Sequence, residues 1–276
     1  MKKIGFVGLG NMGAGMAKNL QKSGFQVLAY DLDKDKINEL EKEGIQGCDS
    51  IKEVTEQVDD AVITMVRNQA QTEDVIFGDN GITSANNHDV TVVVMSTLNP
   101  TIMEELEKKV SDYKLNLLDA PVSGSLSGAE KGSLAIFSSG VQETKSQLKP
   151  YFEAMGSHIF DLGDKIGAGQ AAKLANNLLL GINMVGISEA VKFGNSYGLN
   201  EEDVLDIVEV STGNSWAANN WGEIKEYKNN GTLDAIYKDL TSVIAESTKN
   251  KTFVPVSGLV LNVLHNSMGS EDNQNK

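Results

Sequence analysis

Short apolar runs alternate with longer amphipathic segments through the N-terminal part of the chain. Between the runs, apolar side chains recur at helical spacing. Because buried strands that alternate with helices form parallel sheets covered on both faces, the pattern predicts a doubly wound α/β domain with a mostly parallel sheet. The predicted strands are residues 3–7, 26–30, 60–66, 90–95 and 115–122.

The pattern changes at residues 163–170, where the alternation of strands and helices stops. Residues 171–197 are mostly apolar and contain no proline, which predicts one long buried helix. Helical periodicity returns over residues 233–249 and 254–264. We therefore predict three parts: an α/β domain at residues 1–163, an all-helical domain at residues 164–268 and a polar, solvated tail at residues 269–276.

The first predicted strand leads into a glycine-rich turn. Three glycines follow in the G-x-G-x-x-G order, and a helical pattern begins directly behind them. The first glycine permits a tight turn, the second lets the backbone approach a pyrophosphate, and the third lets the helix pack on the strand. The N-terminus of the helix then faces the anion. The residues predicted to bind a dinucleotide here are Gly8, Leu9, Gly10, Asn11, Met12 and Gly13.

Asp31 ends the second predicted strand at the spacing that this fingerprint requires. Its carboxylate can accept hydrogen bonds from both ribose hydroxyls of NAD, whereas the extra phosphate of NADP would place a second negative charge beside it. The sequence therefore favours NAD. Lys34 and Lys36 keep NADP possible, because a nearby cation can pair with that phosphate.

Two further strand ends supply candidate cofactor contacts, since open α/β sheets bind ligands at the carboxyl ends of their strands. Val66 ends one strand, and Thr97 follows the next. The Thr97 hydroxyl is a candidate contact for the nicotinamide end of the cofactor. The alternative is a Ser/Thr N-cap before the helix predicted over residues 100–110.

A second glycine-rich stretch, residues 123–134, follows the fifth strand and is predicted to be a loop. The Ser123 hydroxyl and successive backbone N–H groups could hold a small anion without a formal positive charge. Such a loop would suit a carboxylate substrate, although an ordinary tight connection would explain the same composition.

Lys173 and Asn177 lie one turn apart on the long predicted helix and share a face with Gly181 and Met184. A lysine among apolar residues is costly unless it has a partner or a role. Desolvation and the positive end of the helix dipole would lower its pKa towards the range in which lysine exchanges protons at neutral pH. The alternative is a lysine whose ammonium group reaches solvent at a helix end.

Composition narrows the function classes. A formal net charge of −14 would repel phosphates, which argues against nucleic acid or an anionic membrane surface as a partner. Cys48 is the only cysteine, so no intramolecular disulfide or multi-cysteine metal site can form, and the cytoplasm is the expected location. The apolar run after the first lysines is too short for a signal peptide or a membrane span. The three histidines have no metal-ligand spacing, and no G-x-S-x-G motif indicates a hydrolase.

Four motifs together resemble the β-hydroxyacid dehydrogenase family, which includes 3-hydroxyisobutyrate dehydrogenase and tartronate semialdehyde reductase. The motifs stand in the family's order and span nearly the whole chain. The resemblance implies a Rossmann domain, an all-helical domain built on a long interdomain helix, and an active site in the cleft between them. The matching residues are 6–13 with 16–20, 119–124, 167–177 and 238–240.

The resemblance also implies residue roles. Lys173 is similar to the family's catalytic acid/base, which protonates the carbonyl oxygen as hydride arrives and removes the hydroxyl proton in reverse. Asn177 would help to place the substrate and the lysine. The implied carboxylate-binding loop is Ser123, Gly124 and Ser125. The implied pair that closes the site from the second domain is Lys238 and Asp239, with Lys238 also touching the cofactor. The family commonly associates through the helical domain, so we expect a homodimer or homotetramer.

The chain departs from the family pattern at three places. Met65, Val66 and Arg67 stand where the family often has Met-Leu-Pro near the nicotinamide, and Ser125 stands where many members have glycine. The run from Gly213 to Trp216 is similar to sugar-acid members such as threonate dehydrogenases, although Trp216 could simply belong to the core.

The sequence therefore predicts an NAD(P)-dependent oxidoreductase that interconverts a small 3-hydroxy acid, 3-hydroxyisobutyrate-like or a sugar acid, and its semialdehyde or oxo acid. A non-catalytic, regulatory Rossmann protein is the main alternative from another class. A 6-phosphogluconate dehydrogenase-like or imine reductase-like enzyme is the alternative among enzymes. The chain is short for the former and shows no basic cluster for a sugar phosphate. Lys173 argues against an imine reductase, because those relatives usually lack a lysine there.

Overall fold

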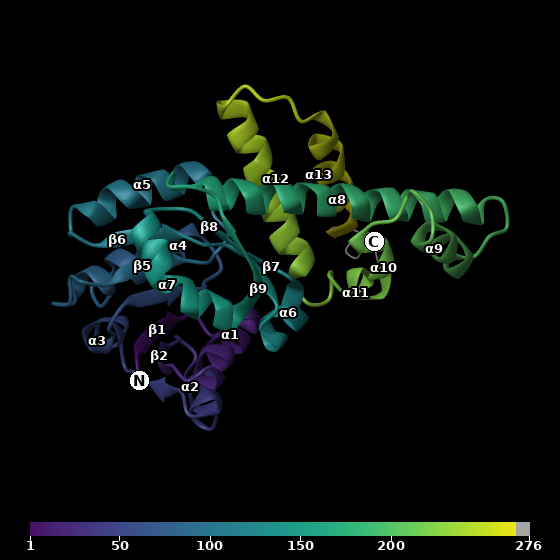
Figure 1. Ribbon diagram of the computed structural model, residues 1–276. Coiled ribbons are helices and arrows are strands. Elements are labelled where there is room, and N and C mark those ends of the chain that lie inside the picture. The colour runs from purple at the N-terminus through teal and green to yellow at the C-terminus, as the bar shows by residue number, and fades with distance from the viewer. Residues whose placement is uncertain (269–276) are drawn as a thin grey trace, which may run out of the picture. The chain divides into compact units, whose positions relative to one another are not determined.

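The computed structural model describes residues 1–268 (Figure 1). The chain forms two compact units, the first from Met1 to Lys173 and the second from Leu174 onward. The boundary between the two compact units, after residue 173, lies inside a helix. The domain boundary predicted from the sequence, between residues 163 and 164, precedes that helix. The polar tail predicted at residues 269–276 lies outside the described residues.

A six-stranded parallel sheet in the order β3-β2-β1-β4-β5-β6 forms the centre of the first unit. The strand order reverses between β1 and β4, which is where open sheets of this kind bind ligands at their carboxyl ends. The predicted doubly wound α/β fold is confirmed. The strands are β1 (Lys3–Val7), β2 (Gln26–Tyr30), β3 (Gln46–Gly47), β4 (Ala61–Thr64), β5 (Thr91–Val94) and β6 (Asn116–Asp119).

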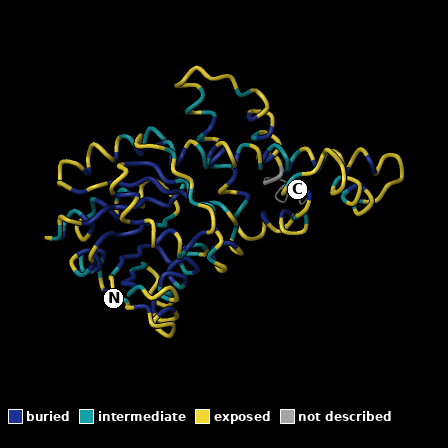
Figure 2. Tube along the Cα trace, viewed as in Figure 1, coloured by how far each residue is buried: buried dark blue, intermediate teal, exposed yellow. Residues whose placement is uncertain are grey.

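Helices cover both faces of the sheet and enclose two apolar cores. Successive strand residues alternate between the cores, with Phe6 in one and Val7 in the other. Strands buried on both faces need continuous apolar runs, and the central strands β4 and β5 are buried along their whole length (Figure 2). One face carries α1 (Asn11–Lys22), α2 (Lys34–Glu41) and α7 (Gln142–Met155); the other carries α3 (Ile51–Gln57), α4 (Gln69–Phe77) and α5 (Pro100–Ser111), with a 3-10 turn, η1, at Ile82–Ser84.

A small three-stranded sheet completes the first unit and corrects one prediction. It consists of β7 (Val122–Ser123), β8 (Leu134–Ser138) and β9 (Gly156–Asp161), with β7 antiparallel and β9 parallel to β8. The single strand predicted over residues 115–122 is wrong, because it ends at Asp119 and the chain then joins the second sheet. Pro121 has no N–H to continue a ladder, and its carbonyl accepts from the Phe137 N–H instead.

The stretch at residues 123–134 was predicted to be a loop but contains helix α6 (Ser125–Lys131) and the start of β8. Helix α6 packs against α1, which composition alone does not reveal. A Cβ on Gly15 of α1 would come within 2.9 Å of the Ala129 carbonyl oxygen, so the two helices approach closely. Gly132 ends α6 in the left-handed region, at φ +66°.

The described part of the second unit is helical, which agrees with the predicted all-helical part. Its apolar side chains form a core that includes Met184, Tyr227 and Leu240. The helices are α8 (Ala168–Asn195), which begins in the first unit, α9 (Glu201–Glu209), α10 (Trp216–Asn219), α11 (Trp221–Lys225), α12 (Thr232–Lys249) and α13 (Pro255–Met268).

Helix α8 is buried along one face only (Figure 2). Leu179 and Phe193, on its remaining surface, are 59% and 68% exposed. The prediction of a buried helix is therefore wrong: apolar residues lie all around α8, but only one side meets the core. By length and composition α8 could cross a membrane, a test that core helices also pass. The buried face includes Leu174, Asn177, Met184, Ile187 and Val191.

Candidate functional site

The turn between β1 and α1 has the geometry of a diphosphate cradle. Gly8 has a φ of +97°, and a Cβ there would lie 2.4 Å from the carbonyl oxygen of Met65. A Cβ on Gly13 would lie 2.0 Å from the carbonyl oxygen of Gly8. A Cβ on Gly10 would meet no atom within 4 Å. Packing therefore requires two of the glycines, and the third leaves room for a ligand.

The first turn of α1 offers backbone donors beside that open space. Gly10 is its N-cap, so within residues 1–268 no side chain caps the helix, and its first turn holds no acidic residue. The N–H groups that begin a helix need acceptors, and the positive end of the helix dipole attracts an anion. The turn, with the backbone of Asn11 and Met12, fits the diphosphate of a dinucleotide.

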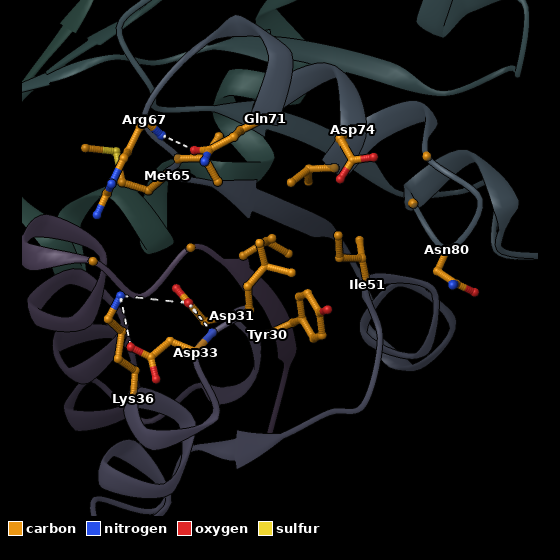
Figure 3. Close-up of a pocket in the computed structure, with 18 of the residues that line it drawn as sticks. Tyr30, Asp31, Asp33, Lys36, Ile51, Met65, Arg67, Gln71, Asp74 and Asn80 are labelled. Carbon is orange, nitrogen blue, oxygen red and sulfur yellow. Dashed lines mark hydrogen bonds and ion pairs between the residues drawn. The ribbon is translucent and has the colours of Figure 1, made fainter.

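A cavity of about 600 Å³ opens in front of this turn (Figure 3), a volume typical of cofactor pockets. Tyr30, Ile51 and Val75 contribute apolar or aromatic walls. Five predicted cofactor residues line it: Gly8, Gly10, Asp31, Met65 and Val66. Leu9, Asn11, Met12, Gly13 and Thr97 lie outside its described lining, and Lys238 belongs to the second unit.

Asp31 lies at the end of β2 with its side chain 13% exposed. Its carboxylate accepts hydrogen bonds from the backbone N–H groups of Leu9, at 2.6 Å, and Asp33, at 2.9 Å. The carboxylate is thus fixed against the glycine-rich turn with its remaining acceptor capacity available to the cavity. Lys36 Nζ lies 3.9 Å from Asp31 Oδ1 and 3.8 Å from Asp33 Oδ2, so a cation is also present at this end.

Arg67 is a cavity residue that the sequence analysis did not assign to cofactor binding. It is the only arginine in the chain, and it follows β4, where ligand contacts are expected; both signals were available. In Figure 3 the charged ends of Arg67 and Lys36 lie at the same end of the cavity, whereas Asp74 and Asn80 lie at the other. This end of the cavity therefore holds two cations, Lys36 and Arg67, together with the carboxylates of Asp31 and Asp33.

The ends of β4 and β5 are joined by Ser96, whose Oγ accepts from the Val66 N–H at 2.8 Å. Thr97 follows Ser96 and is partly buried. The capping alternative for Thr97 is wrong, because Asn99 occupies the N-cap of α5. Thr97 therefore belongs to the loop that leaves β5 rather than to the helix.

The three residues of the predicted carboxylate loop lie where β7 passes into α6. Ser123 ends β7 and is partly buried, and Gly124 has a φ of +137°. Ser125 has a φ of +57°, in the left-handed region that favours glycine. The serine at this position therefore adopts a backbone conformation that glycine takes more readily.

Asp119, at the end of β6, anchors the start of α8. Its carboxylate accepts from the backbone N–H groups of Gly167 and Gln170, both at 3.1 Å. The Gln170 side-chain amide and the Ser139 hydroxyl also donate to it, at 2.9 and 3.0 Å. Burial raises the pKa of Asp119 to about 6, while these hydrogen bonds act to lower it. The group is therefore largely ionised at pH 7.

The predicted catalytic residues Lys173 and Asn177 lie on α8, and the predicted substrate-binding pair Lys238 and Asp239 lies on α12. Lys173 is partly buried, one helical turn after Gln170. Asn177 is buried, and its Nδ2 donates to Asp239 Oδ2 at 2.6 Å. Lys238 Nζ lies 3.2 Å from Asp239 Oδ1. The second unit thus brings Asn177, Lys238 and Asp239 into one cluster. Trp216, by contrast, is 48% exposed and is not a core residue.

Two family models match adjoining parts of the chain. Residues 3–163 match the NAD-binding domain of 6-phosphogluconate dehydrogenase. Residues 167–275 match the family described as NAD-binding of NADP-dependent 3-hydroxyisobutyrate dehydrogenase. The two matches together account for nearly all of the chain, in the order that the four motifs predicted.

Individual relatives agree with these matches. The chain is 31% identical to the 2-(hydroxymethyl)glutarate dehydrogenase of Eubacterium barkeri, over 98% of this chain and 92% of that one. It is 35% identical to the mitochondrial 3-hydroxyisobutyrate dehydrogenase of Mus musculus, over 80% of this chain and 65% of the mouse protein. The crystal structure of 3-hydroxyisobutyrate dehydrogenase from Salmonella typhimurium superposes with a TM-score of 0.84 at 28% identity, over 97% of this chain and 94% of that one.

Proposed function

The chain belongs to the β-hydroxyacid dehydrogenases, NAD(P)-dependent oxidoreductases that act on CH–OH groups, and we propose that its substrate is a small 3-hydroxy acid with a primary hydroxyl. The two enzymes named among its relatives act on 3-hydroxyisobutyrate and 2-(hydroxymethyl)glutarate. Both acids carry a CH₂OH group on the carbon next to a carboxylate, and they differ only in the second substituent of that carbon. Oxidation would give the semialdehyde.

Two features support this proposal. The glycine-rich turn borders a cavity of cofactor size. Lys173 lies on the helix whose first turn is hydrogen-bonded to Asp119, at the end of a strand of the same sheet. Gly8, Gly10 and the first turn of α1 would hold the diphosphate, and Asp31 the adenosine ribose. The nicotinamide, when bound, supplies the hydride chemistry. Ser123, Gly124 and Ser125 would orient the substrate carboxylate.

Lys173 is the proposed general acid and base. Its ammonium would give a proton to the carbonyl oxygen during reduction, and its neutral amine would take the hydroxyl proton during oxidation. Asn177, held by Asp239, would orient the substrate beside the lysine, and Lys238 would contact the substrate and cofactor. These roles follow from the family resemblance, and for Asn177 and Lys238 also from their common partner Asp239.

The test is an absorbance assay of NADH formation with a panel of acids: 3-hydroxyisobutyrate, 2-(hydroxymethyl)glutarate, glycerate and threonate. We expect Lys173→Ala to lower kcat by a factor of about 10²–10⁴, the usual contribution of a general acid or base, while NADH affinity measured by fluorescence stays within about threefold. Lys192→Ala, on the exposed surface of the same helix, is the matched control and should keep full activity. Equal activity of Lys173→Ala and wild type would remove the lysine from the mechanism.

The panel also separates the alternatives. Preference for threonate would favour a sugar-acid enzyme, as the Gly213–Trp216 stretch suggested. Reductive activity on imines, or decarboxylation of 6-phosphogluconate, would favour the enzymes that share this fold. Tight NADH binding without turnover of any acid would favour a non-catalytic, regulatory protein.

We also propose a preference for NAD over NADP. The Asp31 carboxylate, fixed by the Leu9 and Asp33 N–H groups, would repel a 2′-phosphate, and this repulsion outweighs the attraction of Lys36, whose charge is shared between Asp31 and Asp33. We expect Asp31→Asn to weaken NADH binding about tenfold and to leave NADPH binding unchanged or stronger. Parallel loss of both affinities would show that Asp31 only supports the turn.

Self-association through the second unit is the proposed quaternary structure, as a homodimer or homotetramer. Eleven of the seventeen large apolar side chains that are exposed within residues 1–268 lie in this unit, although it is the smaller one. An apolar surface of this kind is typical of an interface between subunits. Sedimentation should show a dimer or larger at micromolar concentration. Phe193→Glu should shift the equilibrium towards monomer. Val141→Glu, which changes an exposed apolar residue of the first unit, should not.

The interface proposal also accounts for the apolar surface of α8 without a membrane. We propose a cytoplasmic protein with no nucleic-acid partner, given the net charge of −14. A mitochondrial relative exists, so fractionation of the source cells, with the protein followed by antibody, is the measurement that decides the compartment.

A further inference from the structure

Gln170 uses every polar atom of its side chain inside the first unit. It is fully buried in the first turn of α8. Its Oε1 accepts from the Leu98 N–H at 2.8 Å, and its Nε2 donates to the Ser96 carbonyl at 3.0 Å. The amide therefore pairs with the backbone on both sides of Thr97, in the way that a neighbouring strand would.

The same side chain also reaches the end of β6. Nε2 donates to Asp119 Oδ1 at 2.9 Å, while Asp119 Oδ2 accepts from the backbone N–H of Gln170 itself. The Ser139 hydroxyl accepts from the Gly169 N–H and donates to the same carboxylate. A Cβ on Gly169 would lie 2.4 Å from the Phe137 carbonyl oxygen, so the helix turn sits directly on the strand ends.

These contacts join two parts of the proposed active site. Ser96 holds the Val66 N–H, so the ends of β4 and β5, with the cofactor-binding Val66 and Thr97, move together. Gln170 connects that pair to the first turn of α8, and Lys173 follows one turn later. The hydride donor would lie against the strand ends and the proton donor on the helix, and both must act on one C–O group.

We propose that Gln170 is a positioning residue. It fixes the two loops that follow β4 and β5, at Val66 and at Thr97, relative to Lys173, so that hydride and proton reach the same C–O group. The inference rests on the proposed function. Its physical basis is that reaction rates fall steeply when reacting groups are displaced: a shift of about 1 Å can cost a factor of about 10². Gln170 touches neither the substrate nor the proton, so its effect passes through the two elements that it joins.

The first test is Gln170→Glu, which keeps the size of the side chain and the acceptor for the Leu98 N–H. It replaces the donor with an oxygen that faces the Ser96 carbonyl and the Asp119 carboxylate. We expect kcat to fall about 100-fold, with the KM of the acid and the affinity for NADH within about threefold of wild type. A fall in NADH affinity as large as that in kcat would overturn the proposal, because Gln170 would then merely support the cofactor site.

The control is Gln147→Glu, at an exposed residue of α7. Gln147 Nε2 also donates to a buried aspartate, Asp60, at 2.9 Å, but at the opposite end of the sheet. Gln147→Glu should lower the melting temperature and leave kcat unchanged. If both variants lowered kcat in proportion to their loss of stability, Gln170 would be a structural residue and the proposal would fail.

A rescue variant sharpens the test. In Gln170→Glu combined with Asp119→Asn, the new amide can donate to the new carboxylate, so the hydrogen bond between the two positions is restored in the reverse direction. The amide oxygen introduced at position 119 can keep the three donors now on Asp119 Oδ2. We expect the double variant to recover kcat about tenfold over Gln170→Glu. No recovery, with folding intact, would contradict a role through this contact.

Hydrogen exchange separates failure of this inference from failure of the proposed function. If wild type oxidises no acid, the proposed function fails, yet the coupling can still be measured. In Gln170→Ala, amides of residues 96–98 and of residues 167–173 should both exchange at least tenfold faster, while Gln147→Ala leaves both segments unchanged. Faster exchange in only one segment would show that Gln170 does not join them.

Discussion

Each end of the six-stranded sheet carries a buried aspartate, and the two are held in opposite ways. Asp60, at the amino end before β4, accepts from the Lys2 ammonium at 2.8 Å, from Gln147 at 2.9 Å and from the Tyr151 hydroxyl at 2.5 Å. Burial tends to raise the pKa of Asp60, but these donors hold it below its ordinary value. Asp119, at the carboxyl end, accepts from neutral donors alone within residues 1–268, and burial raises its pKa to about 6.

The difference separates stability from function. At the amino end, the Lys2 ammonium of the chain itself neutralises the buried carboxylate of Asp60. At the carboxyl end, three of the four donors to Asp119 come from Gly167 and Gln170, at the start of the helix that carries Lys173. The N–H groups that begin α1 are left for a ligand. Changes at the two ends should therefore have different consequences, even where their cost in stability is similar.

The largest effect is expected for Asp119→Ala. It removes the acceptor from four donors, two backbone N–H groups, the Gln170 amide and the Ser139 hydroxyl, in a fully buried site. We expect a loss of about 4 kcal/mol in the free energy of unfolding, measured in urea, together with a loss of kcat. Asp112→Ala, at the exposed end of α5, is the control and should cost less than about 0.5 kcal/mol. A loss below about 1 kcal/mol for Asp119→Ala would mean that water replaces the carboxylate.

Asp60→Asn tests the other end. The amide keeps one oxygen for the donors but turns its NH₂ towards one of them, so we expect a loss of about 2–3 kcal/mol in unfolding free energy. Both kcat and KM should stay within twofold of wild type at a temperature where the variant is folded. A selective fall in kcat would show that the amino end of the sheet also affects the active site. That result would contradict the proposed difference between Asp60 and Asp119.

The fold was accessible from the sequence because the parallel strands are buried on both faces and must be apolar throughout. The second sheet was not. Its strand β9 is mostly exposed, with only Gly156 buried and Ile159 partly buried, so it lacks the continuous apolar run of the parallel strands. The glycines at residues 123–134 resemble those of a loop. The strand breaks at Pro121, whose carbonyl oxygen accepts a hydrogen bond from the N–H of Phe137, and no local pattern reveals that distant partner.

The candidate site divides in the same way. Gly8 and Asp31 could be assigned because a fixed spacing carries their chemistry. Gln170 lies inside the motif at residues 167–177, but its role could not be predicted, because its side chain contacts residues 51 to 74 positions earlier in the chain. Arg67 left a signal, its uniqueness in the chain, that the motif-based reasoning did not use.

The two carboxylates should also respond to pH in opposite directions. Asp119 binds its proton more tightly in the folded state, so its contribution to stability is present below about pH 4 and is lost as the pH rises through about 6. Asp60 binds its proton less tightly when folded, so its contribution is present above about pH 4 and is lost as the pH falls further.

Unfolding in urea at several pH values can measure both effects, with each variant as the reference for its own site. Between pH 7 and pH 4, wild type should gain about 2 kcal/mol relative to Asp119→Asn. Below pH 4, wild type should lose stability relative to Asp60→Asn. Changes of the same sign at both sites would contradict the distinction between the ion-paired and the neutral environment.

The smallest effects distinguish the partners of Asp60. Tyr151 is 2% exposed, so Tyr151→Phe removes a donor that water cannot replace, and we expect a cost of about 1 kcal/mol, with the ring contact to Phe25 retained. The Lys2 side chain is 59% exposed, so in Lys2→Ala water can reach the carboxylate, and the cost should be below about 0.5 kcal/mol. Thermal unfolding at pH 7 in low and high salt measures both. A larger cost for Lys2→Ala that disappears in high salt would mean that the cation, rather than the buried hydroxyl, holds Asp60 in place, and the amino end would then depend on charge.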